Sequence, residues 1–132
     1  MSIKKLEHFN DHRANRFFDL YEDMDCNGQV TASSILPNQF SGWHMHYLQF
    51  DQFTVVKGCI KVVTISPEGD IVEHFLRADN PETLRIEPGY IHCYKSSDEE
   101  ALLIYYLSQK HNEDDEYRFS EEEILEKFNY KV

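Results

Sequence analysis

Two histidines two residues apart, His44 and His46, are the strongest chemical signal in the chain. They lie in residues 42–58, where aromatic and β-branched residues favour a strand that continues to Val56. Side chains alternate between the faces of a strand, so both imidazoles are expected to point the same way, with Leu48 beside them. Buried imidazoles need a ligand, water or protein partner, and histidine titrates near neutral pH. The pair therefore predicts a general base or a metal ligand.

A second informative stretch covers residues 86–94, where Pro88 and Gly89 form a tight turn into a strand. Tyr90, His92 and Tyr94 alternate along that strand and are expected to share one face. The chain between His44 and His92 is long enough for several strands, which can bring the two histidines together. The remaining histidines of the body, His8, His12 and His74, are expected at the surface.

Short apolar stretches separated by turn residues predict the elements that position these side chains. The expected strands cover residues 16–22, 29–36, 42–56, 59–65, 70–76, 83–86, 90–95 and 101–108, after a polar lead-in over residues 1–15. One helix is expected at about 121–128, because Ser120 and Glu123 form a capping box before an apolar stripe of Ile124, Leu125 and Phe128. This pattern predicts an all-β sandwich or barrel with a short C-terminal helix.

Length and charge restrict the class of protein. The 132 residues suit a single domain, with a core at about 16–119. The net charge of −11 disfavours binding to nucleic acid or anionic membranes, and the acidic clusters at 98–100 and 113–126 are expected to be solvated. No apolar run approaches the roughly 20 residues of a membrane span, and the N-terminus has no signal-peptide pattern. Three distant cysteines without a CxxC pair favour reduced thiols in a cytoplasmic protein.

The two histidine motifs together resemble the cupin superfamily. The first reads H-x-H-x4-D-x6-G from His44 to Gly58, with Asp51 at the place that usually holds Glu, and the second reads P-G-x2-H and ends at His92. The resemblance implies a small double-stranded β-barrel, or jelly roll, with its site in the barrel mouth. Cupins with and without metal are known. A metal-binding member would hold Fe, Mn, Ni or Zn with His44, His46, Asp51 and His92.

Longer stretches resemble one group of metal-free cupins more closely. S-G-W-H-M-H-Y-L-Q-F-D, V-V-K-G-C-I-K-V-V, P-G-Y-I-H-C-Y-K and N-E-D-D-E-Y-R-F are similar to dTDP-4-dehydrorhamnose 3,5-epimerases and dTDP-4-keto-6-deoxyglucose 3,4-ketoisomerases. The resemblance spans about residues 16–119. It implies an enzyme without cofactor, usually a homodimer, that acts on a nucleotide-linked 4-keto-6-deoxyhexose for cell-surface polysaccharide. Such enzymes remove a proton next to the ketone and return it to the opposite face or to another carbon.

The resemblance also implies roles for single residues. His44 matches the epimerase base, the H-x-H pair of the ketoisomerases adds His46, and His92 is expected to polarise the keto oxygen. The proton donor stays open among Tyr105, Tyr106, Tyr94 and His111, and Tyr105 is counted with the catalytic residues. Substrate contacts are expected from Arg16, Trp43, Gln49, Tyr90, Tyr94 and His111.

Three departures from the epimerase pattern leave the reaction open. Ser41 replaces an arginine before the first histidine, residues 110–112 replace the catalytic tyrosine, and the sequence ends before a late carboxylate. These differences favour 3,4-ketoisomerisation over 3,5-epimerisation. They also leave room for a catalytically silent cupin that only binds a sugar or sugar nucleotide.

Overall fold

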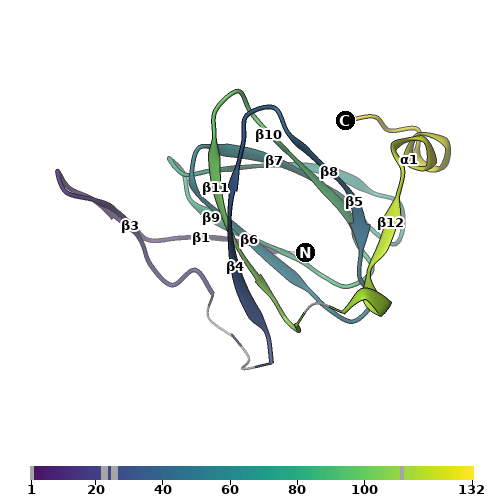
Figure 1. The fold of residues 1–132 in the computed structure, drawn as a ribbon, viewed down its shortest axis with the longest axis horizontal. Helices are drawn as coiled ribbons and strands as arrows, with labels where there is room; N and C mark the ends of the chain where they lie inside the picture. Colours follow the sequence, from purple (N-terminus) through teal and green to yellow (C-terminus); the bar gives the residue numbers. More distant parts are fainter. Residues whose placement is uncertain (1, 22–23, 25–26, 111) are drawn as a thin grey trace.

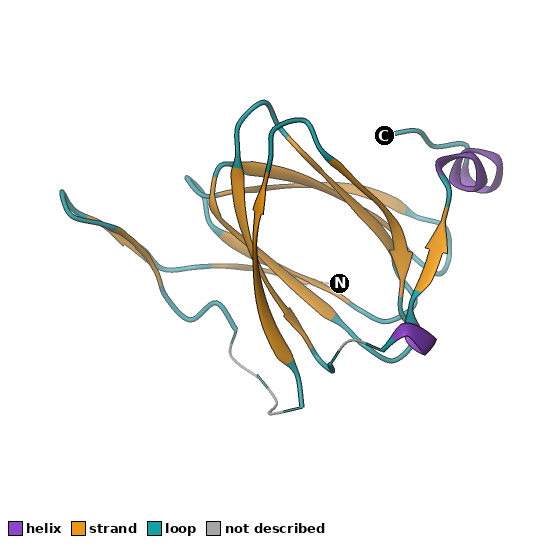
Figure 2. Cartoon of the chain, in the orientation of Figure 1, coloured by secondary structure: helices purple, strands orange, loops and turns teal. Residues whose placement is uncertain are grey.

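Two five-stranded antiparallel sheets face each other and enclose the core of the protein (Figures 1 and 2). The computed structural model describes residues 2–21, 24, 27–110 and 112–132. The first sheet has the order β1 (Ser2–Lys5), β9 (Glu82–Ile86), β6 (Asp51–Lys57), β11 (Ala101–Leu107) and β4 (Gln29–Ile35). The second has the order β12 (Tyr117–Phe119), β5 (Phe40–Met45), β10 (Ile91–Ser96), β7 (Cys59–Ile65) and β8 (Ile71–Arg77).

From β4 onward, successive strands alternate between the two sheets, except in the β7–β8 hairpin. This crossing pattern is that of a small jelly roll, so the predicted all-β fold is confirmed. A short 3₁₀ helix, η1 (Glu113–Asp115), precedes β12, and the predicted helix is present as α1 (Glu121–Phe128) with the capping box of Ser120 and Glu123. Among the described residues, no helix is both long and apolar enough to cross a bilayer.

The N-terminal prediction was wrong. Instead of one strand over residues 16–22, a separate hairpin of β2 (His8–Asn10) and β3 (Asn15–Phe17) projects from the sheets (Figure 1). The polar lead-in contains β1, which pairs with β9 at the edge of the first sheet. An edge strand that is mostly exposed lacks the apolar alternation that reveals a strand in the sequence.

Apolar side chains pack on both faces of the second sheet. The core between the sheets contains Val55, Val62 and Leu103, whereas Trp43, Met45 and Val63 pack on the outer face with Ile124 of α1. Within the apolar stripe predicted for the helix, Ile124 is buried but Leu125 is exposed. A helix this short presents only a narrow face to the sheet, and Leu125 lies beside that face.

His74 is buried rather than at the surface as predicted. It lies on β8 and its Nε2 is 3.2 Å from the Thr64 hydroxyl on the paired strand β7. The hydroxyl satisfies one ring nitrogen, and burial lowers the pKa of this histidine. His8 and His12 are exposed, as predicted.

The single strand predicted through residues 42–56 is instead two strands in opposite sheets. β5 ends at Met45 and β6 begins at Asp51, so Leu48 lies in the connecting turn with its side chain exposed. Asp115 anchors this turn: its carboxylate accepts hydrogen bonds from the backbone N–H groups of Tyr47, Leu48 and Gln49 at 2.9–3.2 Å. A buried carboxylate thus replaces the strand pairing that the turn residues lack.

Asp115 also corrects the prediction that the late acidic cluster is solvated. Its side chain is 3% exposed, whereas its neighbour Asp114 is exposed. Besides the three turn amides, Asp115 accepts a hydrogen bond from Gln109 Nε2 at 3.1 Å. Sequence alone does not reveal which acid in a run of acids turns inward.

We predict that Asp115→Ala lowers the free energy of unfolding by about 2–4 kcal/mol, because it leaves the buried N–H of Gln49 and two partly buried N–H groups without an acceptor. Chemical denaturation monitored by Trp43 fluorescence measures this change. Asp114→Ala, the exposed neighbour in the same 3₁₀ helix, serves as the control and should change stability by less than about 0.5 kcal/mol. Equal effects of the two substitutions would show that Asp115 does not anchor the turn.

Candidate functional site

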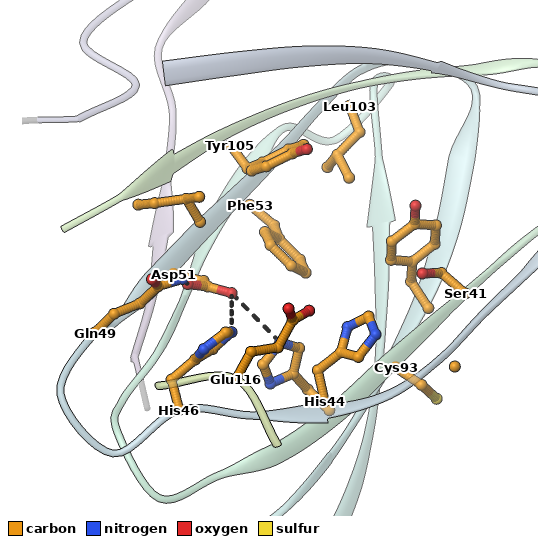
Figure 3. Close-up of a pocket in the computed structure, with 14 residues that line it drawn as sticks. Ser41, His44, His46, Gln49, Asp51, Phe53, Cys93, Leu103, Tyr105 and Glu116 are labelled. Carbon is orange, nitrogen blue, oxygen red and sulfur yellow. Dashed lines mark hydrogen bonds and ion pairs between the residues drawn. The ribbon is translucent and has the colours of Figure 1, made fainter. Parts of the chain in front are cut away.

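A cavity of about 190 Å³ opens between the two sheets, and the two histidine motifs meet on its wall (Figure 3). β5 and the turn after it contribute His44 and His46, β6 contributes Asp51 and β10 contributes His92. Gln49, Phe53, Tyr94, Tyr105 and Glu116 complete much of the remaining wall. Both sheets therefore supply polar groups to one small space.

A β-bulge aims His44 into this cavity. In the pairing of β5 with β10, Ser41 lies opposite Tyr94 and His44 lies opposite His92, so the register shifts by one residue between the two pairs. Residues directly opposite each other share a face, and the extra residue in β5 lets both pairs face the cavity. Trp43, in the bulge, turns to the other face, where its side chain is 2% exposed.

His46, Asp51 and His92 form a tight triad. The Nε2 atom of His92 lies 3.3 Å from Oδ2 of Asp51, and the Nε2 atom of His46 lies 3.8 Å from the same oxygen (Figure 3). The other carboxylate oxygen, Oδ1, accepts a hydrogen bond of 2.6 Å from Nε2 of Gln49. All of these side chains are largely buried.

The second nitrogen of each triad histidine contacts a backbone carbonyl. Nδ1 of His46 lies 2.8 Å from the carbonyl oxygen of Asp115, and Nδ1 of His92 lies 3.3 Å from that of Tyr90. A carbonyl oxygen can only accept, so these contacts place the hydrogen on Nδ1 and leave both Nε2 atoms facing the carboxylate. Two lone pairs beside a carboxylate repel it unless a proton or a metal ion lies between them. The triad is therefore a site for positive charge.

The charges of the triad also set the state of Asp51. Burial by itself would raise the pKa of this carboxyl group, but hydrogen bonds from His92 and Gln49, with the charges of His92 and His46, outweigh burial and hold the pKa below its usual value. Asp51 is therefore a carboxylate at neutral pH.

His44 lies next to the triad but has a different environment. Its ring centroid is 6.3 Å from that of His92, and it is not one of the three residues whose ligand atoms converge. Burial, followed by repulsion from His92 and Arg118, lowers the pKa of His44, while the Glu116 carboxylate acts in the opposite direction. A neutral imidazole facing a cavity can accept a proton, which is what a general base requires.

Aromatic side chains form the wall opposite the histidines. Phe53 meets the rings of Tyr105, His92 and Tyr94 edge to face, with centroids 5.9–6.5 Å apart. Tyr105 on β11 thus faces the cavity from the first sheet, whereas His44 faces it from the second (Figure 3). Tyr106, the next residue of β11, is buried on the other side of the strand beside Tyr21.

The structure brings most of the predicted site residues together. The cavity is lined by His44, His46, His92, Tyr105, Gln49, Tyr94 and Asp51. Arg16 lies apart, on β3 of the projecting hairpin, where it pairs with Asp11 at 3.2 Å. Trp43 packs under α1, and Tyr90 packs against the core between the sheets without lining the cavity. His111 lies outside the described residues.

The positions of Trp43 and Tyr90 outside the cavity lining have local structural reasons. Trp43 precedes His44 directly, so alternation and the bulge turn it to the opposite face of β5, whereas Tyr90 precedes β10, which begins at Ile91, and does not share the strand alternation of His92 and Tyr94. Neither Trp43 nor Arg16 lines the inner cavity, so contact of either residue with a substrate stays a prediction.

Several cavity residues were missed in the sequence. Phe53 follows Asp51 by two positions on β6, and Leu103 and Leu107 flank Tyr105 by two on β11, so alternation along each strand could have identified them. Glu116 carries no such signal. It lines the cavity because β12 pairs with β5 and brings the late acidic segment beside His44.

Comparison with solved structures shows the same fold in several proteins. A dTDP sugar isomerase from Desulfovibrio desulfuricans G20 has a TM-score of 0.86 and 22% identity, covering 98% of this chain and 88% of that one. A dTDP-4-dehydrorhamnose 3,5-epimerase from Bacillus anthracis, with TDP and PPi bound, has a TM-score of 0.74 and 16% identity, covering 88% and 76%. The capsular polysaccharide assembling protein CapF from Staphylococcus aureus has a TM-score of 0.66 and 24% identity.

The CapF match covers 87% of this chain but only 32% of CapF, so the chain spans about a third of that protein. No curated protein was found to match the chain. The structural likeness confirms that the sequence resemblance identified the correct fold. One family model, described as the polysaccharide biosynthesis C-terminal domain, matches residues 9–117. Since this match covers most of the chain, the chain belongs to the polysaccharide biosynthesis C-terminal domain family.

Proposed function

We propose that the protein is an isomerase or epimerase of a dTDP-linked 4-keto-6-deoxyhexose in the biosynthesis of cell-surface polysaccharide. The observation that carries this proposal is the geometry of one cavity, in which His44 and Tyr105 face each other from opposite sheets beside the buried triad of His46, Asp51 and His92. Two similar structures support the substrate class, since one is a dTDP sugar isomerase and the other an epimerase with TDP bound. The family description supports the pathway.

Proton abstraction next to a ketone needs a base and a group that stabilises the enolate oxygen. In the proposed reaction, His44 takes the proton from the carbon, the electron pair of the C–H bond forms a carbon–carbon double bond, and the π pair of the carbonyl group moves to its oxygen as an enolate forms. The His92 ring, protonated at Nε2 against Asp51, lies on the cavity wall, where its positive charge would stabilise that oxygen electrostatically. The enolate then regains a proton at carbon, which restores a ketone.

The source of the returning proton decides the product. Tyr105 and His44 face the cavity from opposite sheets, so a proton from the Tyr105 hydroxyl would reach the face opposite His44 and invert the carbon. A proton returned by His44 to the former carbonyl carbon, while a proton passes from the neighbouring hydroxyl to the enolate oxygen, would instead move the carbonyl group. Both outcomes use the same first step.

A metal ion is the second candidate for the positive charge of the triad. The ligand atoms of His46, Asp51 and His92 lie within 4.8 Å of one another, and both histidines hold their Nδ1 hydrogens against carbonyl oxygens, as metal-binding histidines do. These residues fit a divalent transition metal, with His44 outside the set. A bound ion would polarise the keto oxygen in place of the His92 proton. We propose that protons suffice and that the enzyme needs no cofactor.

The assembly and the compartment are also proposals. A homodimer would cover apolar side chains on the edge strand β8, where Val72 is 41% and Phe75 is 56% exposed. The free thiols of Cys59 and Cys93 suit a reducing cytoplasm.

We expect His44→Asn to lower turnover of the ketosugar at least about a hundredfold, because asparagine cannot accept the proton that His44 takes in the proposed reaction. NMR of sugar hydrogens exchanging with deuterated solvent measures the first step directly. The variant should still bind dTDP, and His12→Asn, at an exposed histidine outside the site, is the control with unchanged exchange. Retained exchange in His44→Asn would show that another residue is the base. Absence of exchange in the wild-type protein, despite dTDP binding, would identify a silent binding domain.

Tyr105→Phe tests the direction of reprotonation. If the enzyme inverts the carbon, this variant should lose product formation at least about a hundredfold while deuterium still enters the substrate, since His44 remains. If the enzyme moves the carbonyl, product formation should persist. Tyr106→Phe, on the opposite side of the same strand, is the matched control. Loss of both product formation and exchange in Tyr105→Phe would contradict its assignment as proton donor alone.

Metal analysis of tag-free protein separates the two forms of the triad. We expect far less than one metal ion per chain, and exchange activity that survives dialysis against EDTA. Stoichiometric metal, with activity lost in EDTA and restored by one divalent ion, would establish the second candidate. In that case His46→Ala should abolish metal retention, whereas His12→Ala should not.

A further inference from the structure

An open groove continues from the cavity to the outside along β5 and β12. It encloses about 470 Å³ and is lined by Phe40, Ser41, Gly42, Trp43, His44, Arg118 and Phe119. Ser41, Gly42 and His44 line both the groove and the inner cavity, so the two spaces adjoin. At Gly42, an added side-chain carbon would meet only Phe40, at 3.9 Å, which leaves the floor of the groove open.

The cavity is too small for a whole nucleotide sugar. Pockets that enclose drug-sized ligands measure roughly 300–1,000 Å³, whereas this cavity measures about 190 Å³. A sugar ring placed at His44 would therefore leave its diphosphate and nucleoside outside. The groove shares His44 with the cavity and is the adjoining space that can receive them.

An anionic ligand needs a local cation on this acidic protein. The net charge is −11, and the cavity itself contains the carboxylates of Asp51 and Glu116. Among the described residues that line the cavity or the groove, Arg118 is the only lysine or arginine. Arg16, the cation first considered for phosphate, lies on the projecting hairpin, and Arg85 stacks on Phe50 at 3.6 Å and pairs with Glu87.

The position of Arg118 suits a group that meets the ligand at the cavity mouth. It lies on β12 directly opposite His44 on β5, so both side chains lie on the same face of the sheet. Its side chain is 72% exposed, and its guanidinium donates a hydrogen bond of 3.1 Å to Glu116. Such an exposed ion pair is weak and can exchange for a stronger partner.

We propose that Arg118 binds the diphosphate of the nucleotide sugar in the groove between β5 and β12. The planar guanidinium matches phosphate oxygens with two parallel hydrogen bonds. In the epimerase pattern an arginine stands at the position of Ser41. Arg118, on the neighbouring strand β12, would supply the positive charge that is missing there. In the absence of a ligand, the hydrogen bond to Glu116 positions the guanidinium of Arg118. This inference rests on the proposed function for the choice of ligand, but the anion site can be tested by itself.

Calorimetric titration of the full chain with dTDP, inorganic pyrophosphate and thymidine tests the proposal. We expect Arg118→Gln to weaken dTDP and pyrophosphate binding by at least about tenfold and to leave thymidine binding unchanged. Arg118→Lys should recover part of the loss, because it keeps the charge but not the planar fork. Arg13→Gln removes the same charge from an exposed arginine on the projecting hairpin and should have no effect. Equal unfolding midpoints would confirm that the variants fold.

The outcomes separate this proposal from the proposed function. If the wild-type protein exchanges ketosugar hydrogens but Arg118→Gln binds dTDP within about twofold of wild type, Arg118 is not the diphosphate ligand and the enzyme function stands. If pyrophosphate binding depends on Arg118 but no exchange occurs, the diphosphate site stands and the enzyme function fails. If the wild-type protein binds neither dTDP nor pyrophosphate, the diphosphate site is overturned, and the exchange assay alone decides the reaction.

Discussion

The site depends on one electrostatic constraint: a buried carboxylate, Asp51, faces two imidazole nitrogens. In the largely buried space between the sheets, this arrangement is stable only with positive charge among the three groups. The charge then becomes available to a ligand, since the same nitrogens line the cavity. A proton on His92 and a divalent ion would both satisfy the constraint, and both would attract a developing enolate oxygen. The proposed stabilisation of the enolate depends on this positive charge beside Asp51.

Much of the surrounding structure keeps these groups in place. Gln49 fixes one oxygen of Asp51, and two backbone carbonyls fix the ring orientation of the histidines. Asp115 contributes twice, because its carbonyl contacts His46 and its carboxylate anchors the turn that joins β5 to β6. The site and the turn therefore share one support, which comes from a segment far along the chain.

The inner cavity and the groove at its mouth are lined by different charged groups. The triad and His44 line the inner cavity, and Glu116 lines the same cavity and pairs with the guanidinium of Arg118. An uncharged sugar ring suits the inner space, and an anionic group suits the outer one. This order matches a nucleotide sugar that enters sugar first. The net charge of −11 would repel an anion, so in the proposed site Arg118 would supply the local positive charge.

The sequence by itself determined the fold class, the capped C-terminal helix and the centre of the site. Alternating apolar stretches and turn residues depend on local geometry, and so does the capping box of Ser120 and Glu123. The histidine motifs could be read for the same reason, because the spacing of His44 and His46, followed by Asp51, is local. His92 joined them through a resemblance rather than through spacing.

Only the tertiary structure decided which neighbours turn inward. The bulge in β5 sends Trp43 outward and His44 inward, although both belong to the same stretch. The pairing of β12 with β5 brings Glu116 and Arg118 to the histidines from a segment that reads as a solvated acidic run. Strand register and bulges depend on contacts between residues distant in sequence, and a single sequence does not contain that information in any local pattern.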